Sequence, residues 1–150
     1  ACYSGSLGPK TREGDMQAPE GFYLVTQKQL NPASSYHLSF NIGYPNDYDL
    51  ALQRTGSLIM IHGDECSIGC FAMTDPLIEE IYLIVEAALQ HTASVPVHIF
   101  PFRMSDERLQ SEKDSPHHDF WQDLHTFHEL FVQTLRVPQV IVKDGRYQAR

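Results

Sequence analysis

The stretch from Gly56 to Asp75, GSLIMIHGDECSIGCFAMTD, carries the residue types that thiol-based acyl transfer requires. A cysteine attacks a carbonyl carbon as its thiolate, and a neighbouring imidazole generates the thiolate by accepting the thiol proton. His62 lies eight residues before Cys70, and that length of chain can fold back so that the two side chains meet. The spacing predicts Cys70 as a nucleophile and His62 as its base.

The small residues around Cys70 add to this prediction. Gly63 and Gly69 let the backbone approach a substrate closely. Backbone N–H groups near Gly69 and Cys70 are candidates for an oxyanion hole, which stabilises a tetrahedral acyl intermediate. Ser67 is a candidate for orienting a substrate carbonyl or for holding the turn. On these residues alone, a structural cysteine in a tight turn and a histidine that is merely hydrogen-bonded at a strand end are open alternatives.

Two elements must position this pair. Ser57 to Ile61 (SLIMI) is a continuous apolar run, which is typical of a central strand that delivers His62. The clearest helix follows Cys70, where Asp75 suits the N-terminal cap and Pro76 the first turn. Its apolar side chains recur at three- and four-residue steps, which predicts one buried face. They are Leu77, Ile78, Ile81, Ile84, Val85, Ala88 and Leu89.

The remaining elements are predicted from the same periodicities. Residues 103–118 are polar and are expected to form a surface loop, and a second helix is expected at about 118–135. Further strands are expected at 22–25, 36–42, 95–99 and 140–142. Strands come first and are then interleaved with helices, which predicts a mixed α+β domain, mostly β at its centre, with two flanking helices.

The bulk properties define the class of protein. The 150 residues predict one domain with its own core, and a hydrophobic content of 42% is ordinary for a globular protein. A net charge of −8 argues against a nucleic-acid partner, because no basic excess is available to displace counterions. No apolar run approaches the roughly 20 residues that span a bilayer. No leader pattern begins at Ala1, so we expect an export signal and one or two leading strands of the domain to precede it.

The pattern from His62 to Cys70, H-G then a spacer then S-x-G-C, resembles the YkuD-like L,D-transpeptidase catalytic domain. GPKTREGDMQAPEGFY, from Gly8 to Tyr23, is similar to the segment ahead of that family's core. Two further stretches resemble the family's YafK branch: LNPASSYHLSFNIGYPNDYD (30–49) and VPVHIFPFRM (95–104). The resemblance covers most of residues 4–104 and is weaker through the second helix.

The resemblance implies a mostly β catalytic domain whose cysteine forms a thioester with a peptidoglycan stem peptide. The histidine is implied as the base and backbone amides as the oxyanion hole, with no metal ion or organic cofactor. The implied partners are stem peptides and a peptidoglycan-linked lipoprotein, and the implied location is the periplasm or another exported site. Tyr44 is a candidate for lining the substrate groove, and Lys10, Arg12 and Arg54 for meeting substrate carboxylates. Packing on the core and ordinary surface charge are the alternatives for these four.

Three positions depart from the family pattern. Ile68 stands where members commonly carry His or Lys, Ala72 where many carry Arg or Asn, and Ala18 where Thr is usual. The first two departures are also found in the YafK branch, which is associated with cutting the bond between diaminopimelate and an outer-membrane lipoprotein. We therefore expect water, rather than a second stem peptide, to resolve the thioester.

Three other functions are compatible with the same residues. One is a secreted antibacterial toxin that damages a competitor's wall with this chemistry. Another is a non-catalytic wall-binding module with a vestigial Cys70, against which the intact His62 and Ser67 argue. The third is an unrelated cysteine peptidase, which the length of the resemblance disfavours.

The other cysteines and a group of histidines are predicted to be structural. Three cysteines leave at least one thiol free or paired between chains, and Cys2 with Cys66 is one conceivable disulfide. Cys66 is otherwise expected to be a packed thiol. Four histidines near the second helix lack the ligand spacing of a zinc site, so we expect solvated or capping side chains. They are His117, His118, His125 and His128.

Overall fold

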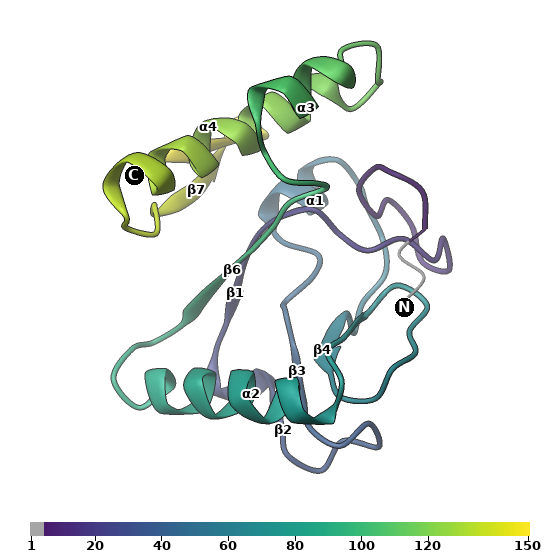
Figure 1. Ribbon diagram of the computed structural model, residues 1–150, viewed down its shortest axis with the longest axis vertical. Coiled ribbons are helices and arrows are strands. Elements are labelled where there is room, and N and C mark those ends of the chain that lie inside the picture. The colour runs from purple at the N-terminus through teal and green to yellow at the C-terminus, as the bar shows by residue number, and fades with distance from the viewer. Residues whose placement is uncertain (1–4) are drawn as a thin grey trace.

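The computed structural model describes residues 5–150 (Figure 1). Its strands are β1 (Gly21–Val25), β2 (Leu30–Asn31), β3 (Ser39–Asn41), β4 (Met60–His62), β5 (Phe71–Ala72), β6 (Val95–Ile99), β7 (Val140–Lys143) and β8 (Arg146–Ala149). Its helices are η1, a 3₁₀ turn (Gln27–Gln29), α1 (Asp47–Ala51), α2 (Asp75–Leu89), α3 (Asp106–Ser111) and α4 (His118–Thr134). The predicted α+β class is confirmed.

A four-stranded sheet, ordered β2-β3-β4-β5, contains the strands on either side of the His62–Cys70 stretch. β3 pairs antiparallel with β2 and β4, whereas β5 runs parallel to β4. β1 and β6 form a separate antiparallel ribbon, and β7 and β8 form a C-terminal hairpin. In Figure 1 the ribbon runs between two ends of the molecule, with α2 and the four-stranded sheet at one end and α3, α4 and the hairpin at the other.

Helix α2 begins at Asp75, as the sequence predicts, with Pro76 in its first turn. Its buried side chains follow three- and four-residue steps and belong to one cluster with residues of β1 and β3. They are Ile78, Tyr82, Val85 and Leu89, packed with Val25 and Phe40. The predicted apolar face is wrong at Leu77 and Ile84, which are 52% and 69% exposed. The helix therefore buries a narrower stripe than the sequence predicts.

An aromatic cluster fills the other end of the molecule. Phe22 of β1, Trp121 and Phe127 of α4 and Tyr147 of β8 are all buried in it. The ring of Phe22 meets those of Phe127 and Tyr147 edge to face, at centroid distances of 5.0 and 4.8 Å. Because Val25 on the same strand packs with α2, β1 connects the two parts of the core.

Two strands are shorter than predicted because the backbone turns into the left-handed region. Leu58, inside the run expected to form a strand at 57–61, has a φ of 56° and is 69% exposed. His37, inside the strand expected at 36–42, has a φ of 67°. A left-handed residue cannot continue a β ladder, so regular pairing begins only at Ser39 and Met60.

The C-terminal third contains more regular structure than predicted. Residues 103–118 hold α3, whose N-terminal cap Ser105 accepts a hydrogen bond from the Arg108 N–H at 3.3 Å. The strand expected at 140–142 is β7, and β8 extends it into a hairpin. In the described part of the chain, no helix combines the length and the apolarity needed to cross a membrane.

Candidate active site

The sheet register brings His62 and Cys70 to one face of the sheet. In the parallel β4–β5 pair, Ile61 aligns with Phe71 and His62 with Ala72. Cys70 precedes β5 by one residue and lies beside Met60, whose N–H donates to the Cys70 Sγ at 3.4 Å. Side chains alternate along a strand, so the histidine and the cysteine point to the face opposite Ile61 and Phe71, which pack in the core.

The Cys70 thiol is half-buried and is held between two backbone groups. Its Sγ accepts from the Met60 N–H and lies 3.7 Å from the Leu58 carbonyl oxygen, to which the S–H donates. After the proton leaves, the N–H donor remains and stabilises negative charge on the sulfur. The left-handed turn at Leu58, which ends the predicted strand early, is what points its carbonyl at the thiol.

The His62 imidazole has a defined tautomer. Its side chain is buried, and Nδ1 lies 2.6 Å from the Gly63 carbonyl oxygen. A carbonyl oxygen only accepts hydrogen bonds, so Nδ1 carries the proton and Nε2 keeps a free lone pair. The Tyr36 ring lies against the imidazole, at a centroid distance of 5.0 Å. His62 is therefore prepared to accept a proton at Nε2.

Both glycines of the motif occupy places where a side chain would not fit. Gly69 has a φ of 116°, and a Cβ there would lie 3.2 Å from the Gln17 carbonyl oxygen. A Cβ on Gly63 would lie 2.5 Å from Asp75 Oδ1 and 2.7 Å from the Tyr36 carbonyl oxygen. The turn before Cys70 thus packs directly on the 5–20 loop, and the residue after His62 packs directly on the start of α2.

Ser67 has an unusual environment. Its Oγ is shielded from solvent and has no hydrogen-bond partner among the described residues. Ile68, by contrast, is 79% exposed, so the one residue that separates Ser67 from Gly69 projects into solvent. A buried hydroxyl without a protein partner is uncommon, which makes Ser67 a candidate for a role in the site.

A cavity of about 350 Å³, not predicted from the sequence, lies between the residues before β3, the turn after β4 and the start of α2. Its lining includes Tyr36, whose ring contacts the His62 imidazole. Three carboxylates line it, those of Asp64, Glu65 and Asp75. The remaining lining residues are Ser35, Tyr36, His37, Thr74 and Pro76. The acidic pair directly after the H-G motif was the signal available in the sequence.

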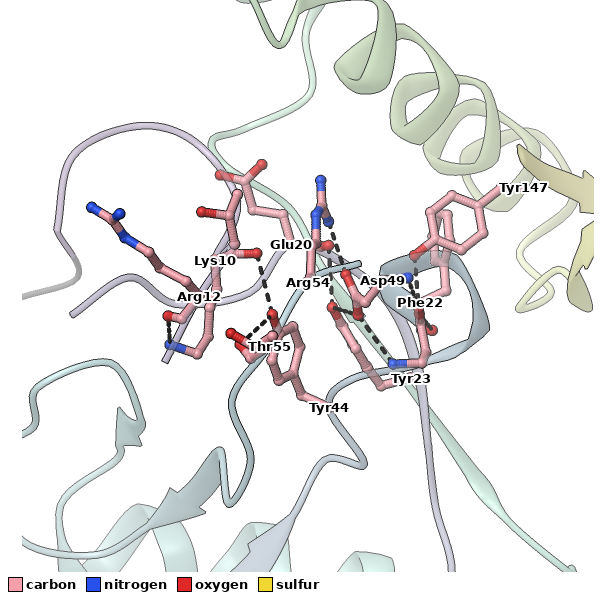
Figure 2. A network of polar contacts seen from close by, with 12 residues as sticks. Lys10, Arg12, Glu20, Phe22, Tyr23, Tyr44, Asp49, Arg54, Thr55 and Tyr147 are labelled. Atoms are coloured by element: carbon pink, nitrogen blue, oxygen red, sulfur yellow. Dashed lines mark hydrogen bonds and ion pairs between the residues drawn. The ribbon is translucent and has the colours of Figure 1, made fainter. Parts of the chain in front are cut away.

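The predicted cationic substrate ligands have other partners. Lys10 is 5% exposed, and its Nζ is 2.7 Å from Asp15 Oδ1. Arg54 is paired at 2.8 Å with Asp49, which is fully buried (Figure 2). Both charges are therefore neutralised within the fold, which corrects the expectation that they meet substrate carboxylates. Arg12 is exposed.

Tyr44 also belongs to the core rather than to a groove. It is 4% exposed and packs in a cluster with Tyr23, Ile42 and Ile59. Its hydroxyl donates to the Thr55 carbonyl oxygen at 3.2 Å, as Figure 2 shows. The structure therefore supports the alternative that the sequence left open for this residue, a turn that packs on the core.

Cys66 and the histidines near α4 are predicted from the sequence to be structural. Cys66 and Cys70 are free thiols, and Cys66 is exposed, so the expectation of a packed Cys66 thiol is wrong. Cys2 and the conceivable Cys2–Cys66 disulfide lie outside the described residues. His125 on α4 is 3.2 Å from Asp106. Residues 5–150 contain no group of three or more His, Cys, Asp or Glu side chains arranged to hold a metal ion.

Comparison with known proteins identifies the class to which this fold and site belong. The model of the YkuD family, the L,D-transpeptidase catalytic domain, matches residues 2–122. The chain therefore belongs to the YkuD family of L,D-transpeptidase catalytic domains.

The relatives refine this placement. The chain is 49% identical over 146 residues to the protein named "Putative L,D-transpeptidase YafK" from Escherichia coli strain K12, and equally to its counterpart in Escherichia coli O157:H7. The match covers 97% of this chain but 59% of those relatives, so the chain spans little more than half of their length. Recognition of the family and of its YafK branch from sequence is confirmed.

Two solved structures share the fold. The K307A mutant of the helical cell shape determining protein Pgp2 from Campylobacter jejuni matches with a TM-score of 0.55 and 24% identity. The match covers 85% of this chain and 44% of that one. A second Pgp2 structure matches with a TM-score of 0.51 and 18% identity, covering 94% of this chain and 62% of that one. At these identities the likeness extends to the fold alone.

Proposed function

We propose that this domain catalyses thiol-dependent acyl transfer on peptidoglycan stem peptides, with Cys70 as nucleophile and His62 as base. The observation that carries the proposal is the shared face of β4 and β5, on which a half-buried thiol and a buried imidazole of fixed tautomer both lie. Membership of the L,D-transpeptidase family supports the substrate class.

The first half-reaction follows from these contacts. His62 Nε2 accepts the thiol proton, and the Cys70 Sγ attacks the carbonyl carbon of an amide at the diaminopimelate residue. Backbone N–H groups near Gly69 stabilise the oxyanion of the tetrahedral intermediate. The intermediate collapses as its C–N bond breaks, and His62 returns the proton to the leaving amine. The product is a thioester on Cys70 and a free amine.

The second half-reaction regenerates the thiol. Water or an incoming amine loses its proton to His62 and attacks the thioester carbonyl, and the C–S bond breaks. The sulfur then recovers the proton, so neither half-reaction requires a cofactor. Ser67, whose Oγ is shielded and has no hydrogen-bond partner among the described residues, is suited to hold the turn before Cys70 during the reaction.

The acidic cavity at the start of α2 suits the amine side of the reaction. Leaving and attacking groups that contain ammonium are complementary to the carboxylates of Asp64 and Asp75. A substrate carboxylate would be repelled there. We therefore assign this cavity to a substrate ammonium group, such as the one at the end of the diaminopimelate side chain, with the neighbouring carboxylate held outside the cavity.

Water is the favoured acceptor in this proposal. Ile68 and Ala72 stand where crosslinking members of the family carry polar or charged residues, and Ile68 is 79% exposed at the site. With apolar side chains there, a second stem peptide is bound less well, and a difference of about 1.4 kcal/mol changes the partition tenfold. The domain then releases a terminal residue or a linked lipoprotein, and it acts outside the cytoplasm, where peptidoglycan lies.

The test is incubation of the domain with purified tetrapeptide muropeptides and with lipoprotein-linked peptidoglycan, followed by mass spectrometry. Loss of a terminal residue or release of a lipoprotein remnant is expected, and the Cys70→Ala variant should form neither product. Crosslinked dimers without cleavage would replace hydrolysis with transpeptidation. If neither substrate is changed, the proposed acyl transfer is contradicted.

A further inference from the structure

Ser39 carries a buried hydroxyl that the resting fold does not use. The residue is 2% exposed, and its Oγ has no hydrogen-bond partner among the described residues. A buried polar group without a hydrogen bond is destabilising, whereas an alanine in its place carries no such penalty. The hydroxyl therefore does not stabilise the state that the structure describes.

The sheet places Ser39 directly opposite His62. The two residues are cross-strand partners in the antiparallel β3–β4 pair, so their side chains project from the same face. The next pair along is hydrogen-bonded, since the Gly63 N–H donates to the Leu38 carbonyl oxygen at 3.1 Å. Hydrogen-bonded and non-hydrogen-bonded pairs alternate, so Ser39 and His62 form the closer, non-hydrogen-bonded kind, with Cβ atoms about 4.5–5.5 Å apart.

Substrate contact does not account for this hydroxyl. The Ser39 side chain is 2% exposed, so it is shielded from a ligand that binds at the surface. Cys70, by contrast, is half-buried. β4 lies between β3 and β5, so the imidazole has Ser39 on one flank and the Cys70 side of the sheet on the other. The side chain that Ser39 can influence is His62.

The ring also has titratable neighbours on every element packed around it. Tyr36 contacts the ring; the titratable groups on the surrounding elements are Cys70 before β5, His37 before β3, Asp64 and Glu65 after β4, Asp75 at the start of α2, and Glu79 on α2, which pairs with His37 at 2.7 Å. Asp64, Glu65 and Asp75 line the open cavity and Glu79 is exposed, so solvent screens these carboxylates. Ser39 is the buried polar neighbour, and its dipole acts on the ring with little screening.

We propose that Ser39 is a positioning residue for His62: its hydroxyl turns its oxygen toward the imidazole ring when His62 takes the proton from Cys70, and it stabilises the positive charge. This inference rests on the proposed function, in which that proton transfer occurs. The resting enzyme carries an unpaired hydroxyl, and the thiolate–imidazolium state gains an oriented dipole.

The experiment measures iodoacetamide alkylation of Cys70 against pH, located by peptide mapping, in a Cys2→Ala/Cys66→Ala background. Ser39→Ala should slow alkylation at neutral pH by about tenfold and move the midpoint of the profile to higher pH. Ser39→Thr keeps the hydroxyl and should retain the parental midpoint. Thermal unfolding of Ser39→Ala should be unchanged or occur at a higher temperature, because the substitution removes an unpaired buried group.

A Ser39→Ala profile that superimposes on the parent's would overturn the inference, as would a loss of stability that accounts for the loss of reactivity. His62→Ala in the same background separates this inference from the proposed function. If His62→Ala leaves the profile unchanged, the proposed base is wrong. If His62→Ala changes the profile and Ser39→Ala does not, only the role of Ser39 fails.

Discussion

Two polar regions of this molecule contrast in how completely their hydrogen bonds are satisfied. Around Asp49, which is fully buried, both carboxylate oxygens are occupied by Arg54 at 2.8 Å, the Tyr23 hydroxyl at 3.0 Å and the Asn46 N–H at 3.1 Å (Figure 2). Around His62, two shielded hydroxyls, those of Ser39 and Ser67, have no partner among the described residues. The first region consists of completed bonds, and the second of groups available for a further state.

Positive φ values occur in both regions, since Gln53, next to Arg54 of the Asp49 network, has a φ of 56°. Next to the His62–Cys70 pair, Leu58, Asp64 and Thr74 all have positive φ values, of 56°, 63° and 67°. Such conformations cost of order 1 kcal/mol each and persist where the surrounding structure imposes them. The comparison teaches that the Asp49 carboxylate is fully paired within the fold, whereas the shielded hydroxyls without a described partner, those of Ser39 and Ser67, lie in the part of the molecule where the chemistry is proposed.

The largest effect is expected at the nucleophile. Cys70→Ala should abolish turnover, because no other group at the site can form the thioester. The far-UV spectrum and the melting temperature should stay close to those of the parent, because the thiol makes weak contacts. Cys66→Ala is the matched control. It should retain most of the activity, because the Cys66 thiol is exposed and is not the proposed nucleophile. An active Cys70 variant with an inactive Cys66 variant would reverse the assignment.

Loss of the base should be the next largest effect. His62→Ala should lower the rate by about 10²–10⁴-fold, the usual contribution of a general base. His125→Ala, on α4 at the other end of the molecule, serves as the control and should have little effect. If His62→Ala changed only the stability, or if chelators removed the activity, His62 would not be the general base.

Substitutions in the Asp49 network should lower the stability of the fold and leave the catalytic activity of the folded molecules unchanged. Arg54→Met leaves a fully buried carboxylate without its charge partner, which typically costs 3–5 kcal/mol in the free energy of unfolding. Urea denaturation measures this loss, and the activity of the molecules that remain folded should be retained. Arg12→Met, on an exposed side chain, is the control and should change stability by less than 1 kcal/mol. Equal stabilities of the two variants would contradict a structural role for the network.

The acceptor side should respond to polarity near Cys70. The double substitution Ile68→Lys and Ala72→Asn introduces residue types found in crosslinking members of the family. It should raise the ratio of crosslinked to hydrolysed product by about tenfold, equivalent to about 1.4 kcal/mol. Product analysis by mass spectrometry gives the ratio directly. An unchanged ratio would mean that these two positions do not select the acceptor.

The smallest effect is expected at Asp15, which anchors the loop against Gly69. Burial acts to raise the pKa of its carboxyl, but hydrogen bonds from the Arg12 N–H, Lys10 Nζ and the Thr11 N–H outweigh it and lower the pKa to about 2. A lowered pKa contributes stability that is present above the ordinary value near 3.8 and is lost as pH falls through about 2. Asp15→Asn should therefore melt below the parent at pH 7, and the difference should close as the pH approaches 2. A difference independent of pH would exclude the carboxylate charge as its cause.

Local signals were sufficient for the elements nearest the chemistry. Residues 75–89 carry a cap, a proline and a regular apolar stripe, and α2 forms there. Cys70 and His62 are close in sequence, so one strand and one turn determine their relation. The left-handed turn at Leu58 carries no such signal, because leucine ordinarily avoids that conformation and only the packed structure imposes it.

Side-chain pairing and strand register explain what the sequence did not reveal. Arg54 and Lys10 look like free surface cations until the fold brings Asp49 and Asp15 against them. The opposition of Ser39 and His62 depends on the register of two strands that are separated by α1 and its flanking loops. Neither composition nor periodicity specifies such a register.

The most direct test of the account is the identity of the covalent intermediate. Rapid quenching of the Cys66→Ala domain with a tetrapeptide stem substrate, followed by intact-protein mass spectrometry and peptide mapping, should reveal an adduct on Cys70. Its mass should equal that of the substrate less the leaving amine, and hydroxylamine should remove it, as expected of a thioester. Product formation without an adduct on Cys70, or an unaltered yield of product from Cys70→Ala, would contradict the account.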